Sequence, residues 1–348
     1  MERAGPFAVG MRAEAGGCLR IMDIRDDGRL LPCDLVSLSG MLRVCKMETV
    51  LLNADGPRAV IDSLVQGEAL FCSAESAFPF RGRFTLPIDW CLFGFVHHTE
   101  ESSWCHGISF SSGTAFTVLP EGTTEFRLSA GSRLSFVLLP LETLQRRYAE
   151  LDRHHAGEPI HLPSLVRLSY TPAAQRLQAI YHDVRQRLIH GPPEGGGEAG
   201  IDIEALLDSH LTASLAATGA DLPNCTRGRR KHYLILQRTE QYMRANLRND
   251  IYVNEMCNAA GVSERALRYA FEDLLGISPN RYLSMLRLCT ACRSLALSDV
   301  SRRSVKSVAL SCGLWDLSRF ADSYRRVFGE LPHDTLMRSP PGDALSAP

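Results

Sequence analysis

The sequence predicts an α+β protein, with an N-terminal β-barrel or cupin-like domain flanked by helices and an all-α C-terminal domain. Three observations predict this fold class. Short apolar runs separated by glycine and proline fill 18–140, and apolar residues recur at helical spacing from residue 172 onward. A pattern of two helices around a glycine then occurs twice near the end of the chain, and one long helical segment joins the two copies.

The first half of the chain is expected to be built of strands. Runs such as WCLFGFVHH, TAFTVLP and RLSFVLLPL are separated by turn residues every 8–12 residues or so, which is typical of a sandwich or barrel. Apolar residues alternate with other residues at Phe126 and Leu128, and again at Leu134 and Phe136. An alternation of period two indicates strands with one buried face.

The middle of the chain is expected to be helical and to link the two halves. A proline at the first turn favours a helix over 172–190, and the apolar stripe of this helix is a candidate dimer surface. The stretch HGPPEGGGEAG (190–200) cannot continue a helix and indicates a flexible linker. A second helix is expected over 203–215, followed by a basic hinge, TRGRRKH (226–232).

The last third of the chain contains one pattern twice, over 255–279 and 307–332. Each copy has a short apolar helix, a glycine, a second helix with an apolar stripe, and a terminal Gly-x-x-Pro. Glycine can adopt the left-handed conformation that ends the first helix, and Ser263 is a good N-cap for the next one. The pattern predicts two helix-turn-helix units, whose second helices can enter a major groove of DNA. The matched positions are Gly261 with Gly313, Leu267 with Phe320, Phe271 with Tyr324, Leu275 with Phe328, Gly276 with Gly329 and Pro279 with Pro332.

A single long helix is expected between the two units, over 280–299. Its apolar face includes Tyr282, Leu286 and Leu295. About 19 residues at roughly 1.5 Å each span about 28 Å, close to the roughly 34 Å between successive major-groove openings on one face of DNA. The helix could therefore hold two recognition helices about one DNA turn apart. The expected domains are 1–170, 171–225, 226–338 and a disordered tail, 339–348.

Charge is unevenly distributed along the chain. Residues 226–338 carry 19 Lys and Arg against 11 Asp and Glu, a net charge of +8, whereas residues 1–225 carry a net charge of −8. A basic half joined to an acidic half suggests that the basic half meets a polyanion such as DNA.

The composition favours a cytoplasmic, nucleoid-associated protein. No apolar run approaches the roughly 18 residues of a membrane span, and the N-terminus lacks the basic and apolar regions of a secretion signal. The 11 cysteines are scattered and odd in number, which fits reduced thiols better than a disulfide framework.

These segments resemble the AraC/XylS family of bacterial transcription regulators. GVSERALRYAFEDLLGISPNRYLSMLRL is similar to the first unit and linker helix of that family, and CGLWDLSRFADSYRRVFGELPHDTLMR is similar to its second unit. The resemblance covers about 232–338, and LRYAF with GLWDLSRFADSYRRVFGELP is similar to a subgroup that includes ethanolamine-utilisation regulators. Family members usually have an N-terminal effector-binding or dimerisation domain. The resemblance therefore implies such a role for the β-rich half, and a homodimer.

The side chains expected to contact DNA lie on the outward faces of the two recognition helices and beside the second unit. Arginine suits guanine because its planar fork meets O6 and N7 together, whereas a carboxylate could accept from cytosine N4 or weaken phosphate binding. Arginines and a lysine near the second unit suit phosphate contacts. On the first helix the candidates are Arg265, Arg268 and Tyr269, at positions where family members place base-contacting side chains. Around the second unit they are Trp315, Leu317, Ser318, Arg319 and Asp322, with Arg302, Arg303, Lys306, Arg325 and Arg326 for phosphate.

Metal, redox and catalytic chemistry are weighed and set aside, and neither a cofactor nor a metal is expected. His97, His98, Cys105 and His106 could meet on paired strands, but their spacing matches no recognised zinc arrangement. The Cys289-x-x-Cys292 motif lies inside a helix, where thiols pack as small apolar groups. An enzyme would need an activated nucleophile, and neither Cys91 nor Cys105 has an evident activating partner. We therefore do not expect an enzyme.

Two interpretations of the N-terminal half remain open. In the first, the protein is a sequence-specific regulator of promoter DNA, and a small-molecule effector of unknown identity binds in the N-terminal domain. In the second, the protein senses no effector, and its N-terminal half only dimerises or binds a partner protein. Contact with RNA polymerase is a further possibility under either reading. Aromatic and histidine side chains suit a small-ligand site, and the candidates are Trp90, Phe93, Phe95, His97, His98, Trp104 and His106.

Overall fold

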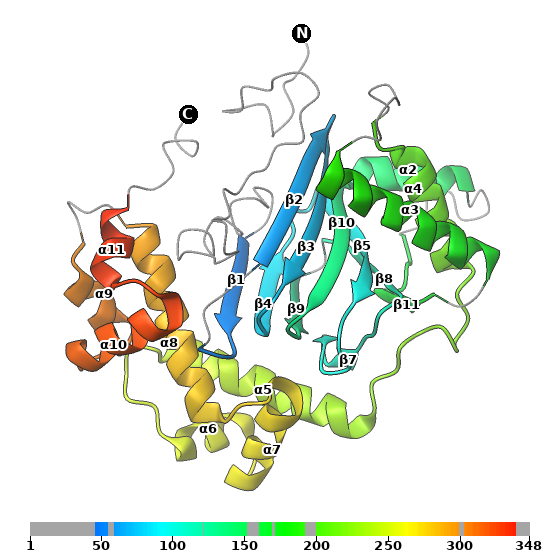
Figure 1. Ribbon diagram of the computed structural model, residues 1–348. Coiled ribbons are helices and arrows are strands. Elements are labelled where there is room, and N and C mark those ends of the chain that lie inside the picture. The colour runs from blue at the N-terminus through cyan, green and yellow to red at the C-terminus, as the bar shows by residue number, and fades with distance from the viewer. Residues whose placement is uncertain are drawn as a thin grey trace.

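The computed structural model describes 46–54, 59–120, 122–151, 160–168, 171–191, 200–298 and 303–338. In these ranges the chain is mostly strands up to Arg167, with one helix before the last strand, and helices afterwards, which confirms the α+β class (Figure 1). Arg302, the expected tail 339–348 and any strand before residue 46 lie outside the described residues, as does most of the expected linker 190–200.

The strands form two antiparallel sheets that face each other, and the expected closed barrel is wrong. Within the described residues no strand pairs one sheet with the other, so each sheet keeps two edges. Alternation along a strand predicts which side chains share a face, but closure depends on stagger between distant strands, which alternation does not report. One sheet has the order β1 (Lys46–Leu51), β4 (Phe80–Thr85), β9 (Thr123–Leu128), β6 (Trp104–Cys105), β7 (Ile108–Ser109). The other has the order β11 (Leu165–Arg167), β8 (Thr114–Val118), β5 (Trp90–His98), β10 (Ser132–Pro140), β3 (Ala69–Ser76), β2 (Ala59–Gln66).

Register within the larger sheet places a glycine between two phenylalanines of the neighbouring strands. Gly94 on β5 lies opposite Phe136 on β10 and Phe116 on β8. A Cβ atom at this position would stand 2.4 Å from the carbonyl oxygen of Ser135 and 2.5 Å from the ring of Phe116. The glycine therefore lets the two phenylalanine rings lie over the strand.

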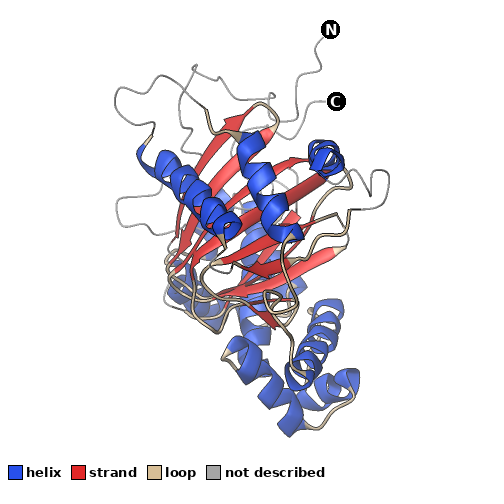
Figure 2. Ribbon diagram, turned by 90° about the vertical axis from the view of Figure 1, so that its right-hand side faces the viewer, coloured by secondary structure: helices blue, strands red, loops and turns tan. Residues whose placement is uncertain are grey.

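Three helices cover the outer face of the larger sheet (Figure 2). They are α2 (Leu141–Leu151), α3 (Pro172–His190) and α4 (Ile203–Leu215), and Thr171 caps α3 by accepting from the backbone of Ala174. The apolar stripe of α3 packs against this sheet and α4, where Leu177 and Tyr181 are almost fully buried. The stripe therefore belongs to the core, and the expectation that it forms a dimer surface is wrong.

Everything after Thr226 that the structure describes as regular is helical. Thr226 accepts a hydrogen bond from the backbone of Arg229 and caps α5 (Arg227–Ala245), so the expected basic hinge is instead the first turn of a helix. The remaining helices are α6 (Val253–Ala260), α7 (Glu264–Leu275), α8 (Pro279–Ala296), α9 (Val305–Ser311), α10 (Leu317–Phe328) and α11 (Pro332–Met337). None of the described helices is long and apolar enough to cross a membrane.

The helix ends in the repeated units are as predicted. Gly261, Gly276 and Gly329 are left-handed C-caps of α6, α7 and α10, with φ values of 69°, 71° and 77°. Ser263 caps α7 by accepting from the backbone of Ala266. Both units are therefore helix-turn-helix structures, and α8 joins them as one continuous helix.

Candidate nucleic-acid interface and ligand cavity

The two recognition helices bury one stripe and expose the other, as the repeat predicts. On α7, Leu267 and Phe271 are fully buried, and on α10 Tyr324 and Phe328 are nearly so. The predicted contact residues that the structure describes are all exposed. They are Arg265, Arg268 and Tyr269 on α7, Trp315, Leu317, Ser318, Arg319, Asp322, Arg325 and Arg326 in and just before α10, and Arg303 and Lys306 at the start of α9.

The exposed face of α7 carries two arginines in different surroundings. The guanidinium carbon of Arg265 lies 5.5 Å from the centre of the Tyr269 ring, so this arginine lies over an aromatic face. Arg268 pairs with Glu264 one turn earlier at 2.9 Å, and both side chains are exposed. An exposed pair of this kind contributes little stability, so Arg268 can leave it for a base or a phosphate.

The start of α10 presents apolar side chains beside charged ones. Asp316 caps the helix by accepting from the backbone of Arg319, which satisfies a backbone donor in the first turn. Trp315 and Leu317 keep 52% and 36% of their surface exposed, although each is large and apolar. Exposed apolar groups beside an arginine suit contact with thymine methyl groups in a major groove.

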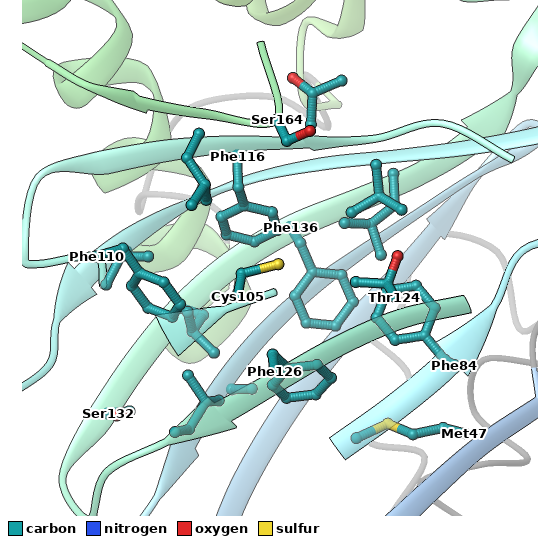
Figure 3. A pocket seen from close by; sticks show the side chains of 18 of the residues that line it. Met47, Phe84, Cys105, Phe110, Phe116, Thr124, Phe126, Ser132, Phe136 and Ser164 are labelled. Carbon is teal, nitrogen blue, oxygen red and sulfur yellow. The ribbon is translucent and has the colours of Figure 1, made fainter. Parts of the chain in front are cut away.

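A cavity of about 360 Å³ lies between the two sheets (Figure 3). Pockets that hold small ligands are commonly about 300–1,000 Å³ and largely apolar, with a few polar groups. This cavity fits that description, because phenylalanine rings project into it from both sheets. Its lining includes Met47, Thr49, Ile61, Cys72, Phe80, Phe84, Leu92, Val96, Cys105, His106, Phe110, Phe116, Thr124, Phe126, Leu128, Ser132, Phe136, His161 and Ser164.

Of the effector residues predicted from the sequence, only His106 lines this cavity. Strand β5 is buried on both faces, and Leu92 and Val96 face the cavity, whereas Phe93 and Phe95 pack under the helices. The other candidates also lie elsewhere. His97 bonds Ser135 at 2.8 Å under α3, and His98 and Trp90 lie at opposite ends of β5, while Trp104 faces α7.

The sequence of β9, rather than that of β5, indicates which alternate side chains line the cavity. Thr124, Phe126 and Leu128 line the cavity, and they alternate with Glu125 and Arg127, which point to the opposite face. On β5 the run WCLFGF is apolar at every position, so its sequence does not indicate which alternate residues face the cavity.

The opposite face of the smaller sheet docks on the helix-turn-helix domain through buried charges. Arg81 on β4 donates to Glu240 of α5 at 2.7 Å and lies 3.1 Å from Glu125 of β9. Glu240 also accepts from Arg244 at 2.8 Å and from the hydroxyl of Tyr282 at 2.7 Å. Burial alone would raise the pKa of Glu240, but Arg81 and Arg244 lower it to about 2. The cluster is therefore charged, and it ties the sheet to α5 and α8.

The β6–β7 hairpin forms a second contact with the same domain. His106 and Gly107 are its two turn residues, with φ values of 49° and 78°, and a Cβ atom on Gly107 would stand 2.8 Å from Tyr233 of α5. Beside the turn, the indole nitrogen of Trp104 donates to the carbonyl oxygen of Leu274 on α7 at 2.8 Å. The turn is thus wedged between the cavity and α5.

Three of the cysteines that the sequence analysis weighed are unactivated thiols. Burial raises the pKa of Cys91, Cys105 and Cys289 to about 12 each. Nucleophilic and redox cysteines need a lowered pKa, so these three do not have the surroundings of a reactive thiol. Among the described residues, no group of three or more His, Cys, Asp and Glu side chains is placed to hold a metal ion.

Comparison with known proteins matches the C-terminal region to a family model described as a helix-turn-helix domain, over residues 256–338. The chain is 27% identical over 234 residues to XylDLEGF operon transcriptional activator 1 of Pseudomonas putida, a match that covers 66% of each chain. It is 36% identical over 110 residues to the transcriptional regulator GbdR of Pseudomonas aeruginosa, which covers 32% of this chain and 29% of that one. The crystal structure of the AraC-like transcriptional activator CuxR is 17% identical, with a TM-score of 0.37, and covers 73% of this chain and 89% of that one.

The chain thus spans about two thirds of the length of its Pseudomonas putida relative. The family model coincides with helices α6 to α11, where both helix-turn-helix units lie. The relatives are transcription regulators, and none of those named is an enzyme. The C-terminal region thus matches a helix-turn-helix family model, and the chain is similar over about two thirds of its length to a bacterial transcriptional activator.

Proposed function

We propose that this protein is a sequence-specific regulator of promoter DNA, controlled by a small molecule that binds between its two sheets. The observation that carries the proposal is the paired exposure of α7 and α10. Both helices present arginines on an open face, and both bury the opposite stripe in the same domain. Activation or repression, contact with RNA polymerase and assembly as a homodimer belong to the same proposal.

The linker helix supports binding to two successive grooves. α8 has 18 residues, and at roughly 1.5 Å per residue it is about 27 Å long. Successive openings of the major groove on one face of DNA are roughly 34 Å apart. Recognition helices attached near the two ends of α8 could therefore reach adjacent openings if α8 stays straight.

The placement of the cavity supports control by a ligand. β9 has alternate residues on two faces, so Phe126 meets the cavity while Glu125 meets the cluster that holds α5. A ligand that moved this strand would move both faces. Control requires a ligand that favours one arrangement of the domains over another. A protein that senses no effector is the alternative, and a cavity of about 360 Å³ between the sheets favours the first reading.

We propose similarity to ethanolamine-utilisation regulators only for the C-terminal half of the chain, which contains the helix-turn-helix units. That similarity rests on segments in α7 and α10, far from the cavity in sequence. A small ammonium alcohol is mostly polar, whereas phenylalanine and leucine dominate the cavity lining. We therefore do not extend the similarity to the ligand.

The test is binding of the full-length protein to the DNA upstream of its own gene, titrated with salt and with random competitor DNA. Binding that survives competitor at moderate salt would support a sequence-specific regulator. Binding that random DNA removes in proportion to its amount would reflect only phosphate attraction, which falls steeply with salt. That second result would count against the proposal.

A further inference from the structure

His106 lies where the cavity meets the interface with α5. It lines the cavity, and its Nδ1 atom lies 3.2 Å from the hydroxyl oxygen of Tyr233 on α5. It is also the only residue other than glycine with a positive φ among those the structure describes. Histidine adopts this left-handed region more readily than most residues, and such positions are common at functional sites.

The partners of Tyr233 determine which nitrogen of His106 carries the proton. The hydroxyl of Tyr233 donates its single proton to Glu125 at 2.8 Å, because an ionised carboxylate can only accept. The Tyr233 oxygen also accepts from the side-chain amide of Gln237 at 3.4 Å, and with no proton left to donate it can only accept from His106, which places the imidazole proton on Nδ1. The other ring nitrogen, Nε2, is then a hydrogen-bond acceptor.

The surroundings also keep the imidazole uncharged. Burial lowers the pKa of His106, and Arg81 lowers it further against the opposing effect of Glu125. No hydrogen bond to Nε2 is seen from any residue in the described part of the chain. The His106 residue is exposed, so a ligand that covers Nε2 must replace its contact with water by a donor, because burying an unpaired polar group costs free energy.

We propose that the cavity binds an uncharged, largely apolar molecule with one hydroxyl group, and that this hydroxyl donates to Nε2 of His106. A phenol or an aromatic alcohol has this chemistry. A carboxylate does not, because it would face a neutral acceptor, and no lysine or arginine lines the cavity among the described residues. The inference rests on the proposed ligand control and names the ligand class.

The same geometry connects the ligand to the DNA-binding domain. From His106 the hydrogen bonds run through Tyr233 to Glu125, Glu125 is ion-paired with Arg81, and Arg81 donates a hydrogen bond to Glu240. Tyr233 and Glu240 both belong to α5, the first helix of the C-terminal domain. A hydroxyl on Nε2 would thus polarise the bond from Nδ1 to Tyr233 and strengthen the contact between the hairpin turn and α5.

The test measures binding of three molecules of similar shape to the full-length protein by calorimetry, without DNA. They are para-ethylphenol, which donates, para-ethylanisole, which cannot donate, and the para-ethylbenzoate anion. We expect the phenol to bind about tenfold more tightly than the anisole, since one net hydrogen bond accounts for roughly that ratio. Equal binding of phenol and anisole, tightest binding of the benzoate, or saturable binding of none of the three would overturn the inference.

Two variants test which cavity histidine accepts the hydrogen bond from the ligand hydroxyl. In His106→Asn the side-chain amide can still reach Tyr233, and asparagine tolerates a positive φ, but no atom replaces Nε2. We expect the preference for the phenol to disappear while binding of the anisole remains, which also shows that the cavity is intact. His161→Asn changes the other cavity histidine and should keep the preference. A preference lost in the His161 variant and kept in the His106 variant would assign the acceptor to His161.

A third variant tests the proton placement. Tyr233→Phe removes the oxygen that holds the proton on Nδ1, so the imidazole can then present an N–H group to the cavity. Binding of the anisole should rise relative to the phenol, which a purely structural role of Tyr233 would not cause. An unchanged ratio of anisole binding to phenol binding would overturn the proposed hydrogen bond from Nδ1 of His106 to Tyr233. These measurements use no DNA, so failure to find specific DNA binding would affect the proposed function alone.

Discussion

Single arginines on the two recognition helices are expected to contribute unequally to DNA binding. Arg268 is exposed on α7 and is held only by Glu264, itself exposed, so a base or phosphate can replace that partner. Arg265 lies over Tyr269, and the ring fixes its direction before DNA is present. Such fixed arginines lose less conformational entropy on binding than free ones.

Arg268→Ala is predicted to weaken binding to the specific site by about 1–3 kcal/mol, the range for a bidentate contact with a base. Competition binding with specific and random DNA measures the loss on each. Arg238→Ala is a matched control, because Arg238 is exposed on α5 and belongs to neither recognition helix. An equal loss on random DNA would show that Arg268 contacts phosphate.

Removing the negative charge at the centre of the domain interface should be severe. Glu240→Gln leaves Arg81 and Arg244 without their shared carboxylate, and Arg81 is almost completely buried. Breaking one partner of a buried pair typically costs about 3–5 kcal/mol of stability. Urea unfolding of the variant at neutral pH measures this cost. A loss below about 1 kcal/mol, the usual worth of an exposed pair, would show that water reaches the cluster.

The same carboxylate predicts an acid-sensitive interface. The pKa of Glu240 is lowered in the folded protein from 4.5 to about 2, so its ionised form stabilises the fold above pH 4.5. That contribution should be lost progressively as the pH falls from 4.5 towards 2. Stability followed over this range should fall more steeply for the wild type than for Glu240→Gln. Parallel curves would contradict the assignment.

At the scale of elements, the repeated helices were predictable and the cavity was not. Helix ends depend on local signals, so Gly261, Ser263 and Gly276 could be assigned from sequence alone. The cavity depends on which face of β5 turns inward, and a strand that is apolar on both faces hides this choice. The charge cluster joins Arg81 to Glu240 across 159 positions, and no local pattern reports such a contact.

Two glycines of the helix-turn-helix units offer a paired prediction. A Cβ atom at Gly276 would meet nothing within 4 Å, so Gly276→Ala should cost only the left-handed conformation, about 1–2 kcal/mol. At Gly313 a Cβ atom would also stand 2.4 Å from the carbonyl oxygen of Leu247. Gly313→Ala should therefore cost clearly more in urea unfolding. Equal costs would show that the chain near Leu247 moves aside without penalty.

At the scale of the whole molecule, the smaller N-terminal sheet is a scaffold for the helix-turn-helix domain. Besides the charge cluster, β1 lies along α8. Glu48 on β1 pairs with Arg244 of α5 at 2.7 Å and with Arg293 of α8 at 3.3 Å. The docking contacts therefore reach α5, α7 and α8. Domains joined in this way are expected to unfold together.

Trp104→Phe tests that coupling. The substitution keeps an aromatic ring against Arg81 and Tyr233 but removes the donor to Leu274 on α7. We expect a loss of about 1–3 kcal/mol from the unpaired buried carbonyl, and a broadened or split melting transition in calorimetry. A single sharp transition at the wild-type temperature would show that this bond does not hold the domains together.

The alternation of β9 also has a consequence for how such a regulator diversifies. Its inward positions, Thr124, Phe126 and Leu128, line the cavity, whereas Glu125 serves the docking interface. Drift at the inward positions can change which molecule fits while the outward positions keep the domains engaged. Proteins that descend from one gene could thus come to bind different ligands while the contacts between the sheet and the helix-turn-helix domain stay the same. An engineer who wanted a sensor for a different compound would randomise those three inward positions first.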